Sequence, residues 1–330
     1  MFTYRRALAG WAISILGLAL AAAPALALAQ TYPSQPIRIV VPYPAGGAGD
    51  IVARNLGQKI SESMGQPVLV DNRPGGTSII GSEIVARAAP DGYTLLLTFD
   101  PPYTTLPYIL RKVPFDAVKD FTPVTRVVRA PQALIVNPAV PARSVKEFIE
   151  YARQNPDKVF AGTTGRGTSQ HFGIELLNQT EKIKLVPVHY KGAPPVVTDL
   201  LAGQIQALIM TLVSVKQHLQ SGKLRALALM ESSRARTAPD LPTIAEAGIP
   251  GFALPDLWIG LFGPAGMPRP IVSRLHAEVV KAANAPEVRA RFEELGFELI
   301  INGPDEMAQA IGQSIRIYRK IATEAGIQPE

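Results

Sequence analysis

The stretch IRIVVPYPAGGAGD, residues 37–50, decides the fold of this chain. Residues 37–41 form a short apolar run that is typical of a buried β-strand, and a segment of helical periodicity begins at Asp50. Glycines between a strand and a helix let backbone N–H groups approach a ligand, and the helix N-terminus carries about half a positive charge. The junction therefore predicts a binding site for an anion, either a nucleotide phosphate or a small carboxylate.

The nucleotide alternative rests on a partial glycine fingerprint. Gly47-x-Gly49 is present, and Asp71 ends the next predicted strand, where an acidic residue would bind a ribose. However, Val52 occupies the third glycine position, and residues 42–45 separate the strand from the glycines. This spacing argues against a dinucleotide and favours a carboxylate.

The N-terminal segment 1–29 has the pattern of a signal peptide. A pair of arginines is followed by an apolar run over 7–23, and Ala27 and Ala29 fit the rule for cleavage before Gln30. We therefore expect an exported protein; the alternative is that the same apolar run anchors the chain in a membrane. No second apolar run of about 18 residues follows in the sequence, which excludes a polytopic membrane protein.

Composition narrows the class of protein further. The chain has 330 residues and no cysteine, so disulfides, thiolate metal sites and cysteine nucleophiles are excluded. A length of about 300 residues beyond the signal peptide is enough for two domains. The formal charge of +6 is spread along the chain without basic runs. This mild excess argues against a nucleic-acid partner and fits a protein that collects anions.

Apolar runs of four to eight residues alternate with segments of helical period, which predicts an α/β fold with mostly parallel sheets. Strands are predicted at 37–41, 68–71, 94–98, 133–136, 158–161, 184–189, 207–210, 224–230 and 258–262. Helices are predicted at 50–64, 78–89, 144–154, 169–178, 196–202, 271–284, 286–295 and 304–325.

Prolines mark two places where the chain is expected to cross between domains. Pro131 and Pro138 flank one predicted strand, and four more prolines lie between positions 239 and 255. Two crossings make the second domain an insertion into the first, which predicts two lobes with a ligand cleft between them. The predicted division is lobe I at 30–133 and 255–330, and lobe II at 134–254.

A second strand-to-helix junction, residues 161–169, also predicts an anion site. It combines glycines with the hydroxyls of Thr164, Thr168 and Ser169 directly before a predicted helix. Capping of that helix by Thr168 or Ser169 explains these hydroxyls equally well. Arg166 lies between two glycines, where it is expected either to pair with a carboxylate or to project into solvent.

Two further positions complete the candidate site. His171 follows in the first turn of the same helix, where it either contacts the ligand or stays on the helix surface. The junction 189–192 places Tyr190, which has a hydroxyl and an apolar face, and Lys191 at another strand end. A fourth junction, 71–78, has the same form and is expected to shape the rim of the cleft.

Motifs for catalysis are absent from the sequence. There is no G-x-S-x-G nucleophile elbow and no H-E-x-x-H zinc pair, and the four histidines lack the spacing of metal ligands. The runner-up hypothesis is an exported α/β hydrolase of small esters or amides. It would use Ser169 and His171, although residues at i and i+2 of a helix do not face each other, or another Ser–His–Asp grouping that assembles only in space. Several anion-binding loops without a nucleophile or metal favour capture of a ligand over its conversion.

Ordered segments along the chain resemble one family. They are YPSQPIRIVVPYPAGGAGDIVAR, DNRPGG, APDGYTLL, PFDAVKDFTPV, HYKGAPPVVTDLLAGQI, LPTIAEAGIPGF and WIGLFGPAGMP. In this order they resemble the solute receptors of tripartite tricarboxylate transporters, the Bug or TctC-like periplasmic binding proteins. The resemblance implies a monomeric, two-lobed receptor of type II-like fold in the periplasm, with no cofactor and no catalysis. Such a receptor closes on a small carboxylate and presents it to integral-membrane permease subunits.

The resemblance also implies residues of the site, with the carboxylate held largely by backbone N–H groups and waters. Carried over by motif, the first-lobe wall is Tyr43, Ala45, Gly46, Gly47 and Asp50, and the second-lobe wall is Thr164, Thr168, Ser169 and His171, with Tyr190 nearby. We add two residues to this expected ligand-binding set: Thr98, at the end of the predicted strand 94–98, and Arg166, between two glycines of the 161–169 junction.

Departures from the family pattern lie where ligand selectivity would be set. Thr77-Ser78 replaces a Gly-Gly pair, Tyr43 stands where phenylalanine is usual, and the usual Asn-Pro is missing after the strand 94–98. Tyr43, Phe99 and Tyr103 together indicate an aromatic carboxylate. The alternatives are a dicarboxylate, or aromatic rings that only pack under the loop.

Overall fold

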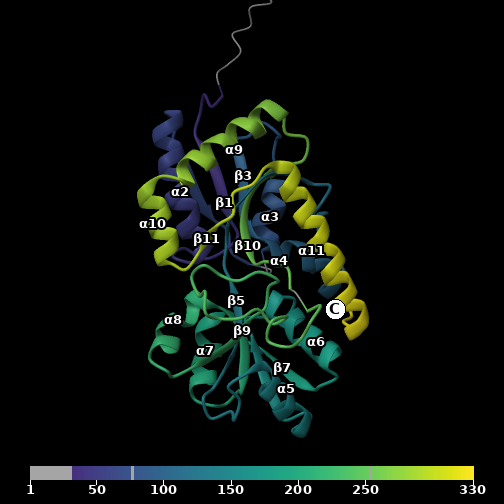
Figure 1. The fold of residues 1–330 in the computed structure, drawn as a ribbon. Coiled ribbons are helices and arrows are strands. Elements are labelled where there is room, and N and C mark those ends of the chain that lie inside the picture. The colour runs from purple at the N-terminus through teal and green to yellow at the C-terminus, as the bar shows by residue number, and fades with distance from the viewer. Residues whose placement is uncertain (1–31, 76–77, 253) are drawn as a thin grey trace, which may run out of the picture. The chain divides into compact units, whose positions relative to one another are not determined.

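The computed structural model describes residues 32–75, 78–252 and 254–330, apart from the side chains of residues 101–103. Over these residues no helix is both long enough and apolar enough to cross a membrane. The predicted signal peptide, and the alternative membrane anchor within it, lie outside the described residues. From Pro36 to Glu330 the chain forms one unit that contains two β-sheets flanked by helices (Figure 1).

The first sheet has six strands in the order β11-β4-β10-β3-β1-β2. These strands are β1 (Ile37–Val41), β2 (Val68–Asn72), β3 (Thr94–Phe99), β4 (Phe121–Arg129), β10 (Trp258–Pro264) and β11 (Glu298–Leu299). The helices that accompany them are α2 (Ala48–Met64), α3 (Ile79–Ala86), α4 (Asp100–Ile109), α9 (Arg269–Ala283), α10 (Pro286–Glu294) and α11 (Pro304–Ala325). This sheet is therefore built from both ends of the described chain.

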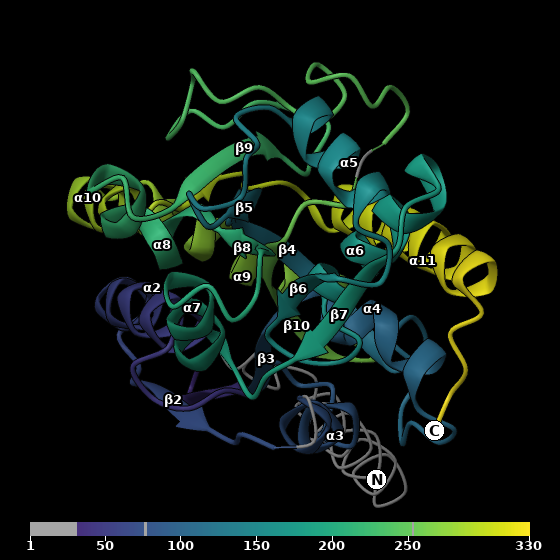
Figure 2. The same ribbon diagram turned by 90° about the horizontal axis from the view of Figure 1, so that it is seen from below.

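The second sheet has five strands in the order β7-β6-β8-β5-β9. They are β5 (Gln132–Val136), β6 (Val159–Thr163), β7 (Leu185–His189), β8 (Ala207–Thr211) and β9 (Arg225–Leu229). Its helices are α5 (Val145–Gln154), α6 (Ser169–Glu181), α7 (Ala193–Leu201) and α8 (Leu212–Gln220). Figure 2 shows α7 and α8 on one side of these strands and α5 and α6 on the other.

Most strands of each sheet run in one direction, as predicted. The exceptions are β10 and β11 in the first sheet and β5 in the second, which run antiparallel to the strands beside them. Only Ala130 and Pro131 separate β4 from β5, so the chain passes from one sheet into the other without a crossover helix. The predicted two-lobed α/β fold is confirmed.

The structure adds four elements to those predicted: α4, α8, β4 and β11. The sequence of α4, DPPYTTLPYI, resembles a loop because it carries three prolines. Prolines are tolerated in the first turn of a helix, where the N–H group that they lack has no partner within the helix. The same effect moves the start of α7 forward to Ala193, because Pro194 and Pro195 lie in its first turn. In β4, Pro123 and Arg126 interrupt the apolar pattern on which strand prediction depends.

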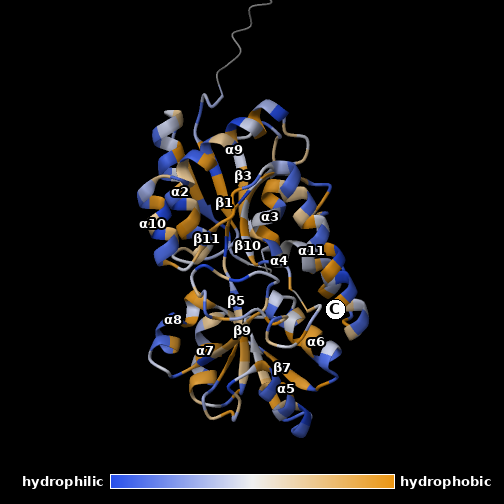
Figure 3. Cartoon of the chain, in the orientation of Figure 1, coloured by the Kyte–Doolittle hydropathy of each residue, from blue (hydrophilic) through white to orange (hydrophobic). Residues whose placement is uncertain are grey.

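The hydrophobic core holds the strand-to-helix junctions in place. Val40 and Val41 of β1 are fully buried, as is Val52 on the inner face of α2, where Leu56 is 1% exposed. Each such side chain stabilises the fold by about 1.5–3 kcal/mol relative to an exposed one. Figure 3 shows the same pattern along the chain, with hydrophobic residues gathered on strands and on the helix faces turned toward them. Because both flanks of residues 42–47 are anchored, this loop is held at a fixed place.

Candidate functional site

A cavity of about 970 Å³ lies between the strand ends of the two sheets. Residues that precede or follow strands of the first sheet supply one wall: Pro42, Tyr43, Pro44, Ala48, Pro74, Gly75, Ser78, Phe99, Ala130, Leu257 and Phe297. Residues at strand ends of the second sheet supply the other: Thr164, Thr168, Ser169, Gln170, Lys191, Gly192, Ala193, Met210, Thr211, Val213 and Ser214. The predicted cleft between two lobes therefore exists, and both predicted anion loops contribute to it.

Six helices begin at this cavity. Their first residues or N-caps line it: Ala48 of α2, Ser78 of α3, Phe99 of α4, Thr168 of α6, Gly192 of α7 and Thr211 of α8. None of these six N-caps accepts a side-chain hydrogen bond from its helix. Away from the cavity, Ser144 Oγ at α5 does accept one from the backbone N–H of Glu147, whereas α9 and α10 also begin without one. The convergent helix starts therefore offer positive partial charge to an anion, and the four without a proline in the first turn, α2, α3, α6 and α8, also offer N–H groups.

The charges around the cavity also suit an anion. Among the described lining residues Lys191 is the only charged side chain. Burial raises the pKa of Asp50, but hydrogen bonds from Arg54 Nε at 3.0 Å and Gly46 N at 2.9 Å outweigh it, and the pKa lies below its usual value. Asp50 is thus neutralised by its partners. Asp100, at the start of α4, is fully buried, and burial raises its pKa to about 7.

Tyr43 is oriented by contacts behind the cavity wall. Its hydroxyl lies 3.1 Å from Thr98 Oγ1 and accepts a hydrogen bond from Phe99 N at 3.3 Å. Its ring packs edge-on against Phe99, with the centroids 5.1 Å apart. Burial raises the pKa of Tyr43, so the phenol stays neutral and is able to donate a hydrogen bond. Both aromatic rings pack on each other and line the cavity, whereas the side chain of Tyr103 lies outside the described residues.

The 164–170 loop of the second sheet is fixed by hydrogen bonds between side chains. Ser169 Oγ donates to Gln132 Oε1 at 2.8 Å, and Thr164 Oγ1 donates to Gln170 Oε1 at 3.1 Å. Thr168 Oγ1 donates to the carbonyl of Gly165 at 2.8 Å instead of capping its helix. The hydroxyls that the sequence suggested as caps therefore shape the loop, and the N-terminus of α6 stays open to the cavity.

The predicted site residues separate into two groups. Tyr43, Thr164, Thr168 and Ser169 line the cavity. Ala45, Gly46, Gly47, Asp50, Thr98, Arg166, His171 and Tyr190 do not belong to its lining. Tyr190 instead donates its hydroxyl to Asp199 Oδ2 at 2.6 Å, and burial, followed by this carboxylate, raises its pKa to about 12. Thr98 is buried behind Tyr43.

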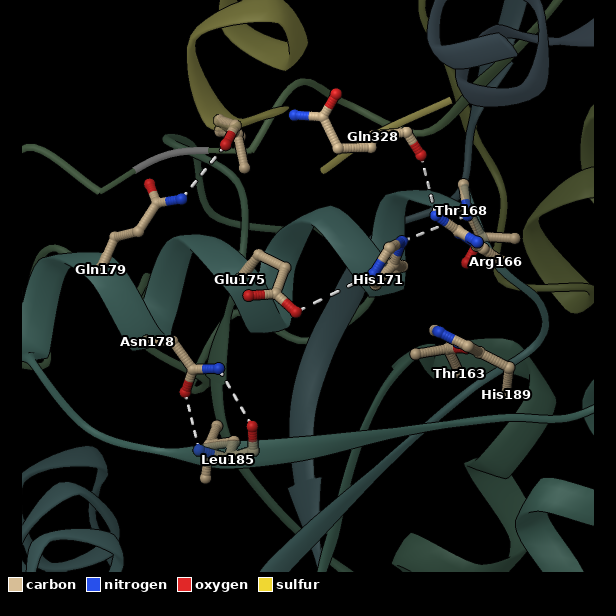
Figure 4. Close-up of polar contacts among 12 residues, drawn as sticks. Thr163, Arg166, Thr168, His171, Glu175, Asn178, Gln179, Leu185, His189 and Gln328 are labelled. Atoms are coloured by element: carbon tan, nitrogen blue, oxygen red, sulfur yellow. Dashed lines mark hydrogen bonds and ion pairs between the residues drawn. The ribbon is translucent and has the colours of Figure 1, made fainter. Parts of the chain in front are cut away.

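His171 supports the loop from behind (Figure 4). Its Nδ1 accepts a hydrogen bond from Gly167 N at 3.2 Å, and its ring lies 4.7 Å from the ring of His189. The Nδ1 of His189 pairs with Thr163 Oγ1 at 2.8 Å. Burial, followed by the charges of His189 and Arg166, lowers the pKa of His171 to about 4. His171 is therefore neutral at physiological pH, and Ser169 Oγ bonds to Gln132 rather than to it.

Arg166 points toward the C-terminal tail in Figure 4. Its guanidinium donates to the carbonyl of Gln328 at 3.0 Å and pairs with the carboxylate of Glu330. The tail is itself tied to the end of α4, since Glu330 N donates to the carbonyl of Ile109 at 3.1 Å. From the sequence we expected Arg166 to pair with a ligand carboxylate or to project into solvent. The structure differs from both expectations, because the partner of Arg166 is the C-terminal tail.

Arg166→Ala is expected to change carboxylate affinity less than about threefold, because its guanidinium contacts the C-terminal residues Gln328 and Glu330. Stability should fall by about 1 kcal/mol or less, since partly exposed ion pairs contribute little. Lys191→Ala, which removes the cation of the cavity wall, should cost more affinity. Calorimetric titration of both variants with a carboxylate ligand measures the affinity, and urea unfolding measures the stability. A loss of tenfold or more for Arg166→Ala would restore the sequence hypothesis that this residue binds the ligand.

Sequence reasoning missed the apolar part of the lining. Ala130, Met210, Val213, Leu257 and Phe297 contribute to it. Leu257 and Phe297 each stand directly before a strand of the first sheet. A large apolar residue just outside a strand is the signal that would have found them, because such a position is otherwise expected to face solvent.

Comparison with known proteins decides the family. The family model for the tripartite tricarboxylate transporter family receptor, TctC, matches residues 52–327. The chain belongs to this family. It is 37% identical over 314 residues to the UPF0065 protein of the tcbD–tcbE intergenic region of Pseudomonas sp. strain P51, covering 94% of this chain and 93% of that protein. It is 32% identical to protein BugT of Bordetella pertussis, covering 95% of this chain and 97% of that protein.

Solved structures of this receptor family share the fold. A Rhodopseudomonas palustris protein solved with adipate is 33% identical, with a TM-score of 0.80 over 91% of this chain and all of that chain. MatC from Rhodopseudomonas palustris, solved with bound malate, is 31% identical, with a TM-score of 0.76 over 88% of this chain and all of that chain. The periplasmic binding protein BugD is 31% identical with the same TM-score. The resemblance drawn from the sequence is thereby confirmed.

Proposed function

We propose that this chain is a periplasmic solute receptor that binds a small carboxylate between its lobes. It then presents the ligand to the permease subunits of a tripartite tricarboxylate-type transporter. The observation that carries the proposal is the convergence of six uncapped helix N-termini on a cavity with no described acidic lining residue. The adipate and malate of the two related structures support a carboxylate as the ligand class.

Binding on this proposal needs no chemistry beyond desolvation and fixed dipoles. The carboxylate exchanges water for N–H groups whose positions are set by α2 and α6, and closure of the lobes removes the remaining water. We propose the lobe division 30–133 with 255–330 and 134–254, with the two crossings as the hinge. Residues 1–29 would direct export as a cleaved signal peptide. The receptor would act as a monomer without a cofactor.

Within the site, we propose direct contacts from Tyr43, Thr164, Thr168 and Ser169, which line the cavity. Ala45, Gly46 and Gly47 would contribute through their backbone when the lobes close. The hydrolase alternative has less support, because Ser169 Oγ donates to Gln132 and His171 accepts from the Gly167 backbone. We therefore propose that the protein is not an enzyme.

A thermal-shift screen of carboxylates against the chain from Gln30 onward tests the function. At a ligand concentration of about 100 times Kd, binding should stabilise the folded protein by about 2.7 kcal/mol, which raises Tm by several degrees. The neutral amide of each acid serves as its control and should leave Tm unchanged. The proposal fails if no mono-, di- or tricarboxylate, aliphatic or aromatic, raises Tm more than its amide does.

A further inference from the structure

Gln132 is the first residue of β5, directly after the crossing from the first sheet into the second. The residue is fully buried. Its backbone is paired, because Gln132 N donates to Glu231 Oε1 at 2.9 Å and the Gln132 carbonyl accepts from Met230 N at 2.9 Å. The side-chain amide therefore extends from a fixed backbone into the protein interior, where its hydrogen bonds must come from neighbouring residues.

The side-chain amide of Gln132 is paired at one end only. Its Oε1 accepts a hydrogen bond from Ser169 Oγ at 2.8 Å, whereas its Nε2 has no partner among the described residues. Buried polar groups are nearly always paired, so this N–H donor needs an explanation. If the amide turned by half a turn, Nε2 would donate to Ser169 Oγ, and the bond from Ser169 to Oε1 would be the one given up. Two orientations of the amide thus each provide one hydrogen bond to Ser169.

Ser169 is a residue for which both orientations are useful. It is the first residue of α6 and lines the cavity. A hydroxyl has one proton to donate, and an ionised carboxylate only accepts hydrogen bonds. While Ser169 donates to Gln132, its Oγ has only lone pairs left to offer to a carboxylate. When the proton turns to the carboxylate, Ser169 Oγ becomes free to accept, and the Nε2 end of the amide supplies the donor.

We propose that Gln132 is a positioning residue whose amide turns over when a carboxylate binds. In the orientation described above, Gln132 Oε1 holds the hydroxyl proton of Ser169. In the bound receptor Ser169 donates that proton to the ligand carboxylate, and Gln132 Nε2 donates to Ser169 Oγ and keeps the hydroxyl directed at the cavity. Hydrogen bonds to ionised groups are the stronger kind, and a donor behind the hydroxyl strengthens them further. The inference rests on the proposed function and deepens it, because Gln132 lies outside the cavity lining and controls one of its donors.

Two single variants and their combination test the inference by isothermal titration. The probe is whichever of malate, adipate, citrate and benzoate binds the original chain most tightly. Ser169→Ala removes the donor and should weaken binding about tenfold or more. Gln132→Met keeps the length of the side chain without its amide and should weaken binding about threefold to tenfold. Adding Gln132→Met to Ser169→Ala should cost less than about twofold more, because the amide acts through the hydroxyl.

The alternative is that Ser169 goes on donating to Gln132 while the acid is bound. Gln132→Met would then free the hydroxyl for the acid, and affinity would stay the same or rise; that result overturns the inference and leaves the proposed function standing. Equal losses from Gln132→Met with and without the Ser169 hydroxyl would overturn it too. Gln179→Met, the same replacement in α6 outside the cavity lining, should leave affinity unchanged. Absence of binding by every acid of the carboxylate screen contradicts the proposed function as well.

Nuclear magnetic resonance of the isotope-labelled chain gives a readout that a purely structural glutamine would not change. The side-chain amide signal of Gln132 is identified by its absence from Gln132→Met, or from Gln132→Leu if the methionine variant does not fold. Saturation with the same acid should move one of the two Nε2 proton signals downfield, as a new hydrogen bond does. Ser169→Ala should abolish this shift. A Gln132 amide signal that stays in place when the original chain is saturated would overturn the inference.

Discussion

Thr168→Asp is expected to weaken carboxylate binding by roughly 100-fold to 1,000-fold while changing the stability of the protein by about 1 kcal/mol or less. Two like charges about 4 Å apart repel by about 4 kcal/mol at an effective dielectric constant of about 20. The same carboxylate is a better N-cap than threonine and lies favourably in the field of α6, a gain of about 0.5–1 kcal/mol that offsets the loss of the hydrogen bond from Thr168 Oγ1 to the Gly165 carbonyl. Thr168 has extended backbone and no capping hydrogen bond, so the new side chain fits there. A large loss of binding with little change in stability distinguishes a ligand site from a structural one.

Two controls isolate the charge at α6. Thr168→Asn offers a similar cap without the negative charge and should reduce affinity far less. Ser144→Asp introduces an acid at the N-cap of α5, away from the cavity, and should leave binding unchanged. Titration with the best ligand of the carboxylate screen and urea unfolding give both quantities. Full affinity in Thr168→Asp would mean that the N-terminus of α6 does not face the bound carboxylate.

Local chemistry explains which parts of the fold the sequence could predict. The junction at residues 37–50 combines a strand, a glycine turn and a helix start within one short stretch, and each is specified by its own neighbours. In contrast, α4 carries Pro107 inside the helix and is held by packing against α11, with which it shares many contacts. Tertiary packing overrides local preference there, so no short window of sequence predicts that helix.

The candidate site shows the same contrast between features set by neighbouring residues and features set by distant ones. That Thr164 and Tyr43 face a cavity follows from their position after parallel strands, which the sequence pattern provides. The direction of the Arg166 side chain depends on Gln328 and Glu330, and the lowered pKa of His171 depends first on its burial and then on the charge of His189. Such partners are distant in sequence and are placed by the fold alone. Spacing within a motif therefore identified the loops but not the orientation of each side chain in them.

Glu231→Gln is expected to raise the free energy of unfolding by roughly 3–4 kcal/mol at pH 8 and to leave it nearly unchanged at pH 5. Glu231 is 2% exposed, and its Oε1 accepts a hydrogen bond from Gln132 N at 2.9 Å. Burial, together with Asp256, raises its pKa from 4.5 to about 8, although Gln132 N and Arg129 oppose the shift. Glutamine keeps the acceptor for Gln132 N and removes the charge that the interior disfavours.

The sign of the pH effect follows from proton binding. Between about pH 4.5 and pH 8 the folded protein keeps the Glu231 proton and the unfolded chain has lost it, so stability falls as pH rises through this window. Asp100, whose pKa burial raises to about 7, adds a contribution of the same sign. The free energy of unfolding of the original chain, measured in urea, should therefore fall by up to about 1.4 kcal/mol per pH unit for each group as the pH rises. Glu231→Gln should reduce this dependence on pH.

The control for Glu231→Gln is Glu324→Gln, which removes the same charge from an exposed position on α11. It should leave the slope of stability against pH unchanged. If Glu231→Gln lowers stability equally at pH 5 and pH 8, Glu231 is ionised in the folded protein, and Arg129 outweighs burial at the crossing between the sheets. A gain confined to high pH instead means that Glu231 carries a neutral carboxyl group in the folded protein.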